Sequence, residues 1–144
     1  MFTHKQISPF YASLFIDKQK AFYMPSPFIH KRDSMGRLED LKSNIDEYFQ
    51  SAELLFKQGL TNAAFMMYFK TLVAIADYTL WRDLRVLPDN HRERFRMLKL
   101  RYPDLYNVLS HYFPYYRDTY TRRVDDRLLI AVRSDVIKLK EKVE

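Results

Sequence analysis

The amino-acid sequence predicts an all-α protein, an up-and-down bundle of four to five antiparallel helices preceded by a helical arm. Glycine occupies only two of the 144 positions, Gly36 and Gly59, whereas all-β folds usually need many more turns that depend on glycine. Apolar residues instead recur at steps of three and four, which is the spacing of one helix face. The connections between these stretches are short, and short connections make neighbouring helices antiparallel.

Residues 1–33 form an aromatic arm in front of the bundle, which comprises residues 34–144. We expect a helix in this arm with an apolar side made of Phe10, Leu14, Phe22 and Met24. The arm carries more apolar surface than an isolated segment tolerates in water. It should therefore pack on its own bundle or on a second copy, and a homodimer is expected because symmetric self-contacts are the commonest.

Two long helices should open the bundle. Asp33 or Ser34 can cap the first helix, which ends at Gly59. Its apolar positions lie along one face: Leu38, Leu41, Ile45, Tyr48, Phe49, Ala52, Leu55 and Phe56. The second helix begins with Thr61 as its N-cap and runs to about Leu84. It is apolar nearly all round, as a central buried helix would be.

Three further helices follow. Asn90-x-x-Glu93 resembles a capping box that opens a helix over 90–101. Pro103 suits the first position of a fourth helix, which reaches about Arg122 and should be kinked at Pro114. The last helix starts at Asp125 or Asp126, and its apolar face consists of Leu128, Val132, Val136 and Leu139.

Composition excludes several classes of function. The chain has no cysteine, so a disulfide framework, a thiol nucleophile and a thiolate–zinc site are impossible. The four histidines (His4, His30, His91 and His111) lack the spacing of metal ligands, so neither a metal nor a cofactor is expected. No apolar run approaches the about 20 residues that span a bilayer, and charged residues interrupt the apolar stretch near the N-terminus. We therefore expect a cytoplasmic protein without a membrane partner.

The formal net charge of +6 suits a polyanionic partner, although a solvated basic surface would carry the same charge. Much of the excess lies in residues 82–101, where Phe95 and Leu98 should face inward and the cations outward. Arg92 and Arg96 are therefore candidate ligand-binding residues that could follow a nucleic-acid backbone. The alternative is a solvated helix face.

A second candidate region is residues 115–123, YYRDTYTRR. Guanidinium groups bind phosphate bidentately, and tyrosine rings stack on bases. The candidate ligand-binding residues here are Tyr116, Arg117, Tyr120, Arg122 and Arg123. In the alternative interpretation the tyrosines complete the core, and the arginines pair with Asp118, Asp125 and Asp126.

Residues 48–59, YFQSAELLFKQG, and residues 62–69, NAAFMMYF, resemble the core of HEPN domains, the helical bundles named for higher eukaryotes and prokaryotes nucleotide-binding. That family typically shows an Ala-Glu-x-Leu helix end, a glycine, and an alanine-rich second helix with a central aromatic. A Thr/Asn-His segment that opens the next helix also recurs, and Asn90-His91 matches it. The resemblance covers roughly residues 34–144 and implies a HEPN-like bundle.

The resemblance also implies a function. Many HEPN members are metal-independent ribonucleases or toxins with an Arg-polar-x(3–5)-His motif, in which the histidine transfers a proton and the arginine binds phosphate across a dimer. Arg117-Asp118 matches the start of this motif, but no histidine follows it in the chain. Arginine stays protonated near pH 7 and cannot replace the missing base. The family's partner is often a small nucleotidyltransferase.

These observations predict a HEPN-like binding module without ribonuclease activity, whose ligand is RNA, a nucleotide or a nucleotidyltransferase-type partner. The alternative is a toxin-like ribonuclease in which His91 or His111 acts with Arg117. His91 suits that role because a histidine at a helix N-terminus tends to stay neutral, although a histidine at such a junction is more often a structural hydrogen-bonding residue. A third possibility is a purely structural protein-interaction module. Asp77, inside the apolar second helix, should pair within the bundle with an arginine such as Arg117 or Arg82.

Overall fold

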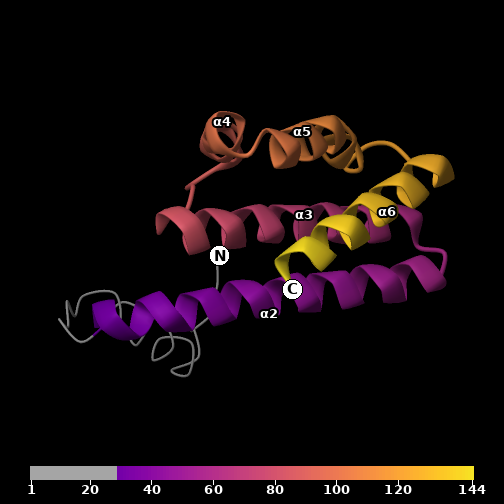
Figure 1. Ribbon diagram of the computed structural model, residues 1–144. Helices are drawn as coiled ribbons and strands as arrows, with labels where there is room; N and C mark the ends of the chain where they lie inside the picture. The colour runs from indigo at the N-terminus through magenta and orange to yellow at the C-terminus, as the bar shows by residue number, and fades with distance from the viewer. Residues whose placement is uncertain (1–28) are drawn as a thin grey trace, which may run out of the picture. The chain divides into compact units, whose positions relative to one another are not determined.

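The computed structural model describes residues 29–144, with side chains from Gly36 onward, and over this range it is helical without a strand (Figure 1). The helices are α2 (Ile29–Lys57), α3 (Thr61–Leu84), α4 (His91–Arg101), α5 (Pro103–Asp118) and α6 (Asp126–Val143). The prediction of an all-α bundle is confirmed. The helix expected around Phe10, Leu14, Phe22 and Met24 lies outside the described residues. The chain divides into Met1–Asp33 and Ser34–Glu144, and all side-chain contacts given below lie within the second unit.

Helix α3 is the centre of the bundle. It packs directly against α5 and α6, and α2 runs antiparallel along it (Figure 1). Phe65, Tyr68, Phe69 and Leu72 are completely buried on it, which confirms the central buried helix that its apolar composition predicted. The burial of these four side chains removes their apolar surface from water, and such burial is the main stabilising contribution in a helical bundle.

The turn from α2 to α3 depends on Gly59. Its φ of 74° is left-handed backbone that glycine adopts without a steric penalty. The Gly59 amide donates to the carbonyl of Phe56 (3.1 Å) and the Leu60 amide to that of Leu55 (3.0 Å), which together form a Schellman motif. The glycine prediction is confirmed, but Thr61 is not the N-cap. The tight turn makes Leu60 the N-cap, and Thr61 is the first helical residue.

Helix α2 begins earlier than predicted. Asp33 and Ser34, expected as its cap, both lie inside the helix, which starts at Ile29. An N-capping residue marks the start of a helix only where the backbone before it cannot be helical. Residues 29–35 contain neither proline nor glycine, so nothing in this stretch prevents the helix from continuing toward the N-terminus.

The starts of α4, α5 and α6 agree with the sequence. The Asn90 side chain caps α4, Pro103 occupies the first turn of α5, and the Asp125 carboxylate accepts the Arg127 amide at 2.6 Å at the start of α6. Pro114 lies inside α5 as predicted. The end of α5 differs, because the helix stops at Asp118 instead of about Arg122.

Asn62 explains why α5 stops there. Its side-chain amide donates to the carbonyls of Thr119 (3.2 Å) and Arg122 (2.7 Å) and accepts the Val124 amide (2.8 Å). One side chain on α3 therefore satisfies three backbone groups of the turn before α6. Without Asn62, these backbone groups would need hydrogen bonds from water or from a continuing helix.

A second polar contact joins α2, α3 and α6. Arg133 on α6 forms two bonds with the Glu53 carboxylate of α2, at 2.7 and 3.0 Å. The buried Tyr68 of α3 donates its hydroxyl to the same carboxylate at 2.6 Å. The Arg133 bonds lower the pKa of Glu53 despite its partial burial, so the carboxylate stays ionised and the three helices share one anion.

Asn62→Ala should lower the free energy of unfolding by about 1–3 kcal/mol, because three backbone groups lose their partner and two of these bonds are partly buried. Urea denaturation monitored by circular dichroism measures this. Asn107→Ala is the matched control, since Asn107 is exposed on α5, and it should stay within about 0.5 kcal/mol of the unsubstituted protein. Equal stability of the two variants would contradict the role given to Asn62.

Candidate functional site

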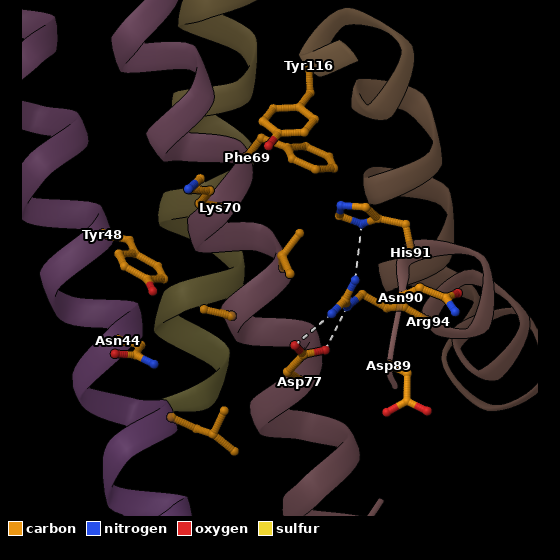
Figure 2. Close-up of a pocket in the computed structure, with 13 residues that line it drawn as sticks. Asn44, Tyr48, Phe69, Lys70, Asp77, Asp89, Asn90, His91, Arg94 and Tyr116 are labelled. Atoms are coloured by element: carbon orange, nitrogen blue, oxygen red, sulfur yellow. Dashed lines mark hydrogen bonds and ion pairs between the residues drawn. The ribbon is translucent and has the colours of Figure 1, made fainter. Parts of the chain in front are cut away.

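Among the described residues, one concave site is a cavity of about 480 Å³, a size within the range of small-molecule sites, roughly 300–1,000 Å³. We call it the His91 cavity. It lies between α2, α3, the first turn of α4 and the end of α5 (Figure 2). The residues that determine its chemistry are Asn44, Tyr48, Phe69, Lys70, Asp77, Asp89, His91, Arg94 and Tyr116.

Local sequence at the start of α4 positions His91. The Asn90 side chain accepts the Glu93 amide at 2.9 Å, and the Glu93 carboxylate accepts the Asp89 amide at 3.0 Å. This is the expected capping box, except that its returning bond reaches Asp89 instead of Asn90. The cap begins the helix at His91, so the imidazole projects from the first turn into the cavity (Figure 2).

Arg94 ties α4 to α3 through Asp77. Its Nε donates to one Asp77 carboxylate oxygen at 2.7 Å and its Nη2 to the other at 2.9 Å. The Arg94 side chain is 9% exposed and that of Asp77 18%. The expected arginine partner of Asp77 is therefore confirmed, but it is Arg94 instead of Arg117 or Arg82, and the outward placement of Arg94 is wrong. Arg82 instead pairs with its neighbour Asp83.

The same arginine determines the tautomer of His91. Arg94 Nη1 lies 3.1 Å from His91 Nδ1, and because a guanidinium can only donate, Nδ1 must be the acceptor. Burial and the adjacent Arg94 charge both lower the pKa of His91, so the ring is neutral at pH 7. A neutral ring whose Nδ1 accepts carries its hydrogen on Nε2.

Aromatic rings form one wall of the His91 cavity. The rings of Phe69 and Tyr116 are stacked, with centroids 4.5 Å apart and planes inclined by 20°. The imidazole of His91 lies 5.2 Å from Phe113 and 6.3 Å from Phe69. These packed rings hold the wall in place, because each is limited by its neighbours.

The open side of the cavity carries single polar groups. Lys70 on α3 is exposed, and it forms no ion pair with any residue that the structure describes. Asn44 and Tyr48 come from α2 on the opposite side of Lys70 from His91 (Figure 2). The site therefore combines stacking surface with a few hydrogen-bonding groups, the usual composition of a ligand pocket.

The structure divides the predicted ligand-binding residues among several places. Tyr116 lines the His91 cavity, whereas Arg122 and Arg123 line a separate cavity of about 230 Å³ beside Leu128. Arg117 is exposed, and Tyr120 is 71% exposed beyond the end of α5, where its ring forms a T-shaped pair with that of Tyr116. Among the described residues, no ion pair joins the three arginines to Asp118, Asp125 or Asp126.

Arg92 and Arg96 lie on the exposed face of α4 together with Lys99. These three residues are spaced at i, i+4 and i+7, so they share one stripe of the helix, and we call them the α4 cation row. Lys99 lies above the Tyr106 ring at 5.8 Å. The row begins at Arg92, which directly follows the cavity residue His91 in the sequence.

The candidate catalytic residues do not form a common site. His111 is exposed on α5, where its ring contacts those of Tyr112 and Tyr115. Within residues 36–144, no hydrogen bond or ring contact joins Arg117 to His91 or His111. The described part of the chain also contains no group of three residues arranged to hold a metal ion and no helix long and apolar enough to cross a membrane.

Sequence reasoning missed Lys70, Asn44 and the Asp77–Arg94 pair. A signal for part of this site is present, because Phe69, Val73 and Asp77 follow each other at steps of four on α3. This spacing places them on one stripe, and a carboxylate at the end of an apolar stripe indicates a buried cation partner. The identity of that partner cannot be inferred from spacing, since several arginines are available.

Arg94→Met should cost about 2–4 kcal/mol in the free energy of unfolding, because it leaves the Asp77 carboxylate largely buried without its cation. Arg96→Met removes the same charge from the exposed face and should change stability by no more than about 0.5 kcal/mol. Thermal and urea unfolding of both variants provide the comparison. A cost below about 1 kcal/mol for Arg94→Met would show that the pair is not stabilising.

The lowered pKa of His91 predicts a pH dependence of stability. The unfolded chain has a histidine pKa of about 6.5, so as the pH falls below this value the unfolded state takes up a proton before the folded state does. Stability is therefore lost from pH 6.5 downward through the folded pKa. His91→Asn should lose less stability between pH 7 and 5.5 than the unsubstituted protein. Nitrogen-15 NMR should show the neutral Nε2–H tautomer of His91 at pH 7. If the stability of His91→Asn and of the unsubstituted protein falls equally with pH, the prediction is wrong.

Comparison of the chain with protein-family models, with curated proteins and with solved structures finds no match. The HEPN resemblance therefore depends on the residues quoted above, and no family is assigned.

Proposed function

We propose that this protein is a helical module that binds RNA or a nucleotide and does not cleave RNA. One observation carries the proposal: a cavity with an aromatic wall lies at the N-terminal end of α4, the helix whose exposed face bears the α4 cation row. Single-stranded nucleic acids are bound by this combination of cations for the backbone and aromatic rings for the bases.

The cations of the row are available to a ligand. Arg92 and Arg96 are exposed and form no ion pair with any described residue. Arg94 and Leu98, on the opposite side of the helix, are buried against the bundle. The inner side of α4 thus fixes the helix, while the outer side presents charge that can replace the counterions of a phosphate backbone.

The chemistry of His91 supports binding without cleavage. A general base needs an unprotonated nitrogen within reach of the substrate. The unprotonated Nδ1 of His91 is already engaged by Arg94, and Nε2 carries the hydrogen. A neutral imidazole is also a poor acid, so His91 supplies neither half of a proton-transfer pair.

The HEPN resemblance adds to this interpretation, because the histidine of the family's motif is absent after Arg117. A homodimer and a small nucleotidyltransferase partner stay predictions from the sequence. The purely structural alternative differs from our proposal in one respect, since it expects no affinity for nucleic acid.

Filter binding of single-stranded RNA across a salt series tests the proposal. Affinity should fall as salt rises, because each phosphate contact on a single strand contributes about 0.7 to the slope of log K against log salt. Replacing both Arg92 and Arg96 by Gln should lower the slope by about 1.4. Arg127→Gln with Lys138→Gln removes the same charge from exposed positions on α6 and should leave the slope nearly unchanged. Absent binding, or salt-independent binding, would refute the proposal.

The same RNA preparations show whether cleavage occurs. Incubation of structured and unstructured RNA with the protein should produce no new fragments. If fragments appear and either His91→Ala or His111→Ala abolishes them, the protein is a ribonuclease and the non-cleaving module is excluded.

A further inference from the structure

We infer that the His91 cavity binds the uncharged base of a single nucleotide and leaves its phosphates outside. This inference rests on the proposed function and names the part of the ligand that the cavity recognises. It follows from the charge balance of the cavity, its aromatic wall and the hydrogen-bonding groups that face into it.

The charges that line the cavity cancel. Its cations are Lys70 and Arg94, and its carboxylates are Asp77 and Asp89. Arg94 is already engaged, because its Nε and Nη2 bind Asp77 and its Nη1 binds His91. Lys70 is thus the one lining cation without an ion-pair partner among the described residues, and it is exposed. Several phosphates would lose water without gaining enough positive charge in return.

The aromatic wall favours a planar ligand. Phe69 is fully buried and supports the half-buried Tyr116 ring through their 4.5 Å stack. A base against the accessible part of the Tyr116 ring would gain stacking energy, about 1–3 kcal/mol in single-strand binding proteins. Stacking does not require charge, so the wall discriminates between the base and the phosphate of the same nucleotide.

Three of the hydrogen-bonding groups that line the cavity are neutral: the His91 imidazole, the Asn44 amide and the Tyr48 hydroxyl. Nε2 of His91 faces the space beside Phe69 and Lys70, while Nδ1 faces Arg94 (Figure 2). The Asn44 amide and the Tyr48 hydroxyl line the cavity from α2, and neither makes a side-chain hydrogen bond with a described residue. A nucleobase edge offers carbonyl or ring-nitrogen acceptors and amino donors, which match an N–H donor, an amide and a hydroxyl.

The cavity volume agrees with one base and its sugar. At about 480 Å³ the cavity lies in the lower half of the range for ligand pockets. An RNA strand could therefore place one unpaired base in the cavity while its backbone follows the α4 cation row outside. The His91 cavity and the α4 cation row would then bind different parts of the same nucleotide chain.

NMR titration of the nitrogen-15-labelled full chain tests the inference with free ligands. The four nucleosides, their 5′-monophosphates and their 5′-triphosphates are added at equal ionic strength. At least one nucleoside should shift the amide signals around His91 and Lys70. Its monophosphate should bind within about threefold of the nucleoside, and its triphosphate no more tightly than the monophosphate. A triphosphate that binds tenfold or more tightly than the nucleoside would overturn the inference.

Two substitutions of His91 isolate the donor that faces the cavity. Asparagine can place its Oδ1 where Nδ1 accepts from Arg94, but it has no group at the position of Nε2. Glutamine restores an N–H donor near that position. His91→Asn should weaken nucleoside binding about fivefold, the effect of one hydrogen bond of about 1 kcal/mol, and His91→Gln should recover most of it. Equal losses would contradict the donor role, and circular dichroism confirms that both variants are folded.

Lys138→Gln on α6 is the charge control and should leave nucleoside affinity unchanged. RNA binding without any nucleoside binding would refute the base pocket and leave the proposed function standing. Failure of both RNA and nucleosides to bind would refute both. An oligonucleotide with abasic sites separates the phosphate contacts from base binding. It should retain the salt-dependent affinity that the α4 cation row provides and lose the affinity that the His91 cavity provides.

Discussion

The contact between Arg94 and Asp77 is the interaction on which the arrangement of this protein depends. It places a cation and an anion in a largely buried position between α4 and α3, where an unpaired charge is costly. Two parallel hydrogen bonds fix the guanidinium relative to the carboxylate, and this geometry holds the first turns of α4 against the middle of α3. The remaining guanidinium donor reaches His91, so one side chain determines both the packing of a helix and the protonation of a histidine.

The site that results is neutral inside and cationic outside. Inside the His91 cavity, the two cations and two carboxylates balance, and the remaining groups are mainly aromatic rings and uncharged hydrogen-bonding atoms. Outside it, the α4 cation row is exposed because Arg94 and Leu98 occupy the buried side of the same helix. A helix with one buried arginine and several exposed ones thus separates two kinds of recognition, since buried charge positions the structure and exposed charge attracts a ligand.

The HEPN resemblance predicts a functional site at Arg117, but the geometry favours the His91 cavity. Arg117 is exposed, whereas the preceding Tyr116 turns inward and stacks on Phe69. The turn that follows is held by Asn62, which terminates α5 and directs Arg122 and Arg123 toward a smaller cavity. The arginine-rich segment is consequently divided among three environments, and of its residues only Tyr116 lines the His91 cavity.

The sequence by itself determined the helices, because their signals are local. The left-handed Gly59, the Asn90 cap, Pro103 and the Asp125 cap each act within one turn of the chain, and the apolar spacing of α3 identifies it as the buried helix. The first turn of α2 and the end of α5 could not be read in the same way, since the first has no local stop and the second depends on Asn62. Only the tertiary structure decided which polar groups meet. Arg94 and Asp77 are 17 residues apart, Val124 and Asn62 are 62 apart, and Arg133 and Glu53 are 80 apart. Spacing along the chain cannot select among several arginines for one carboxylate, because that choice follows from how the helices pack.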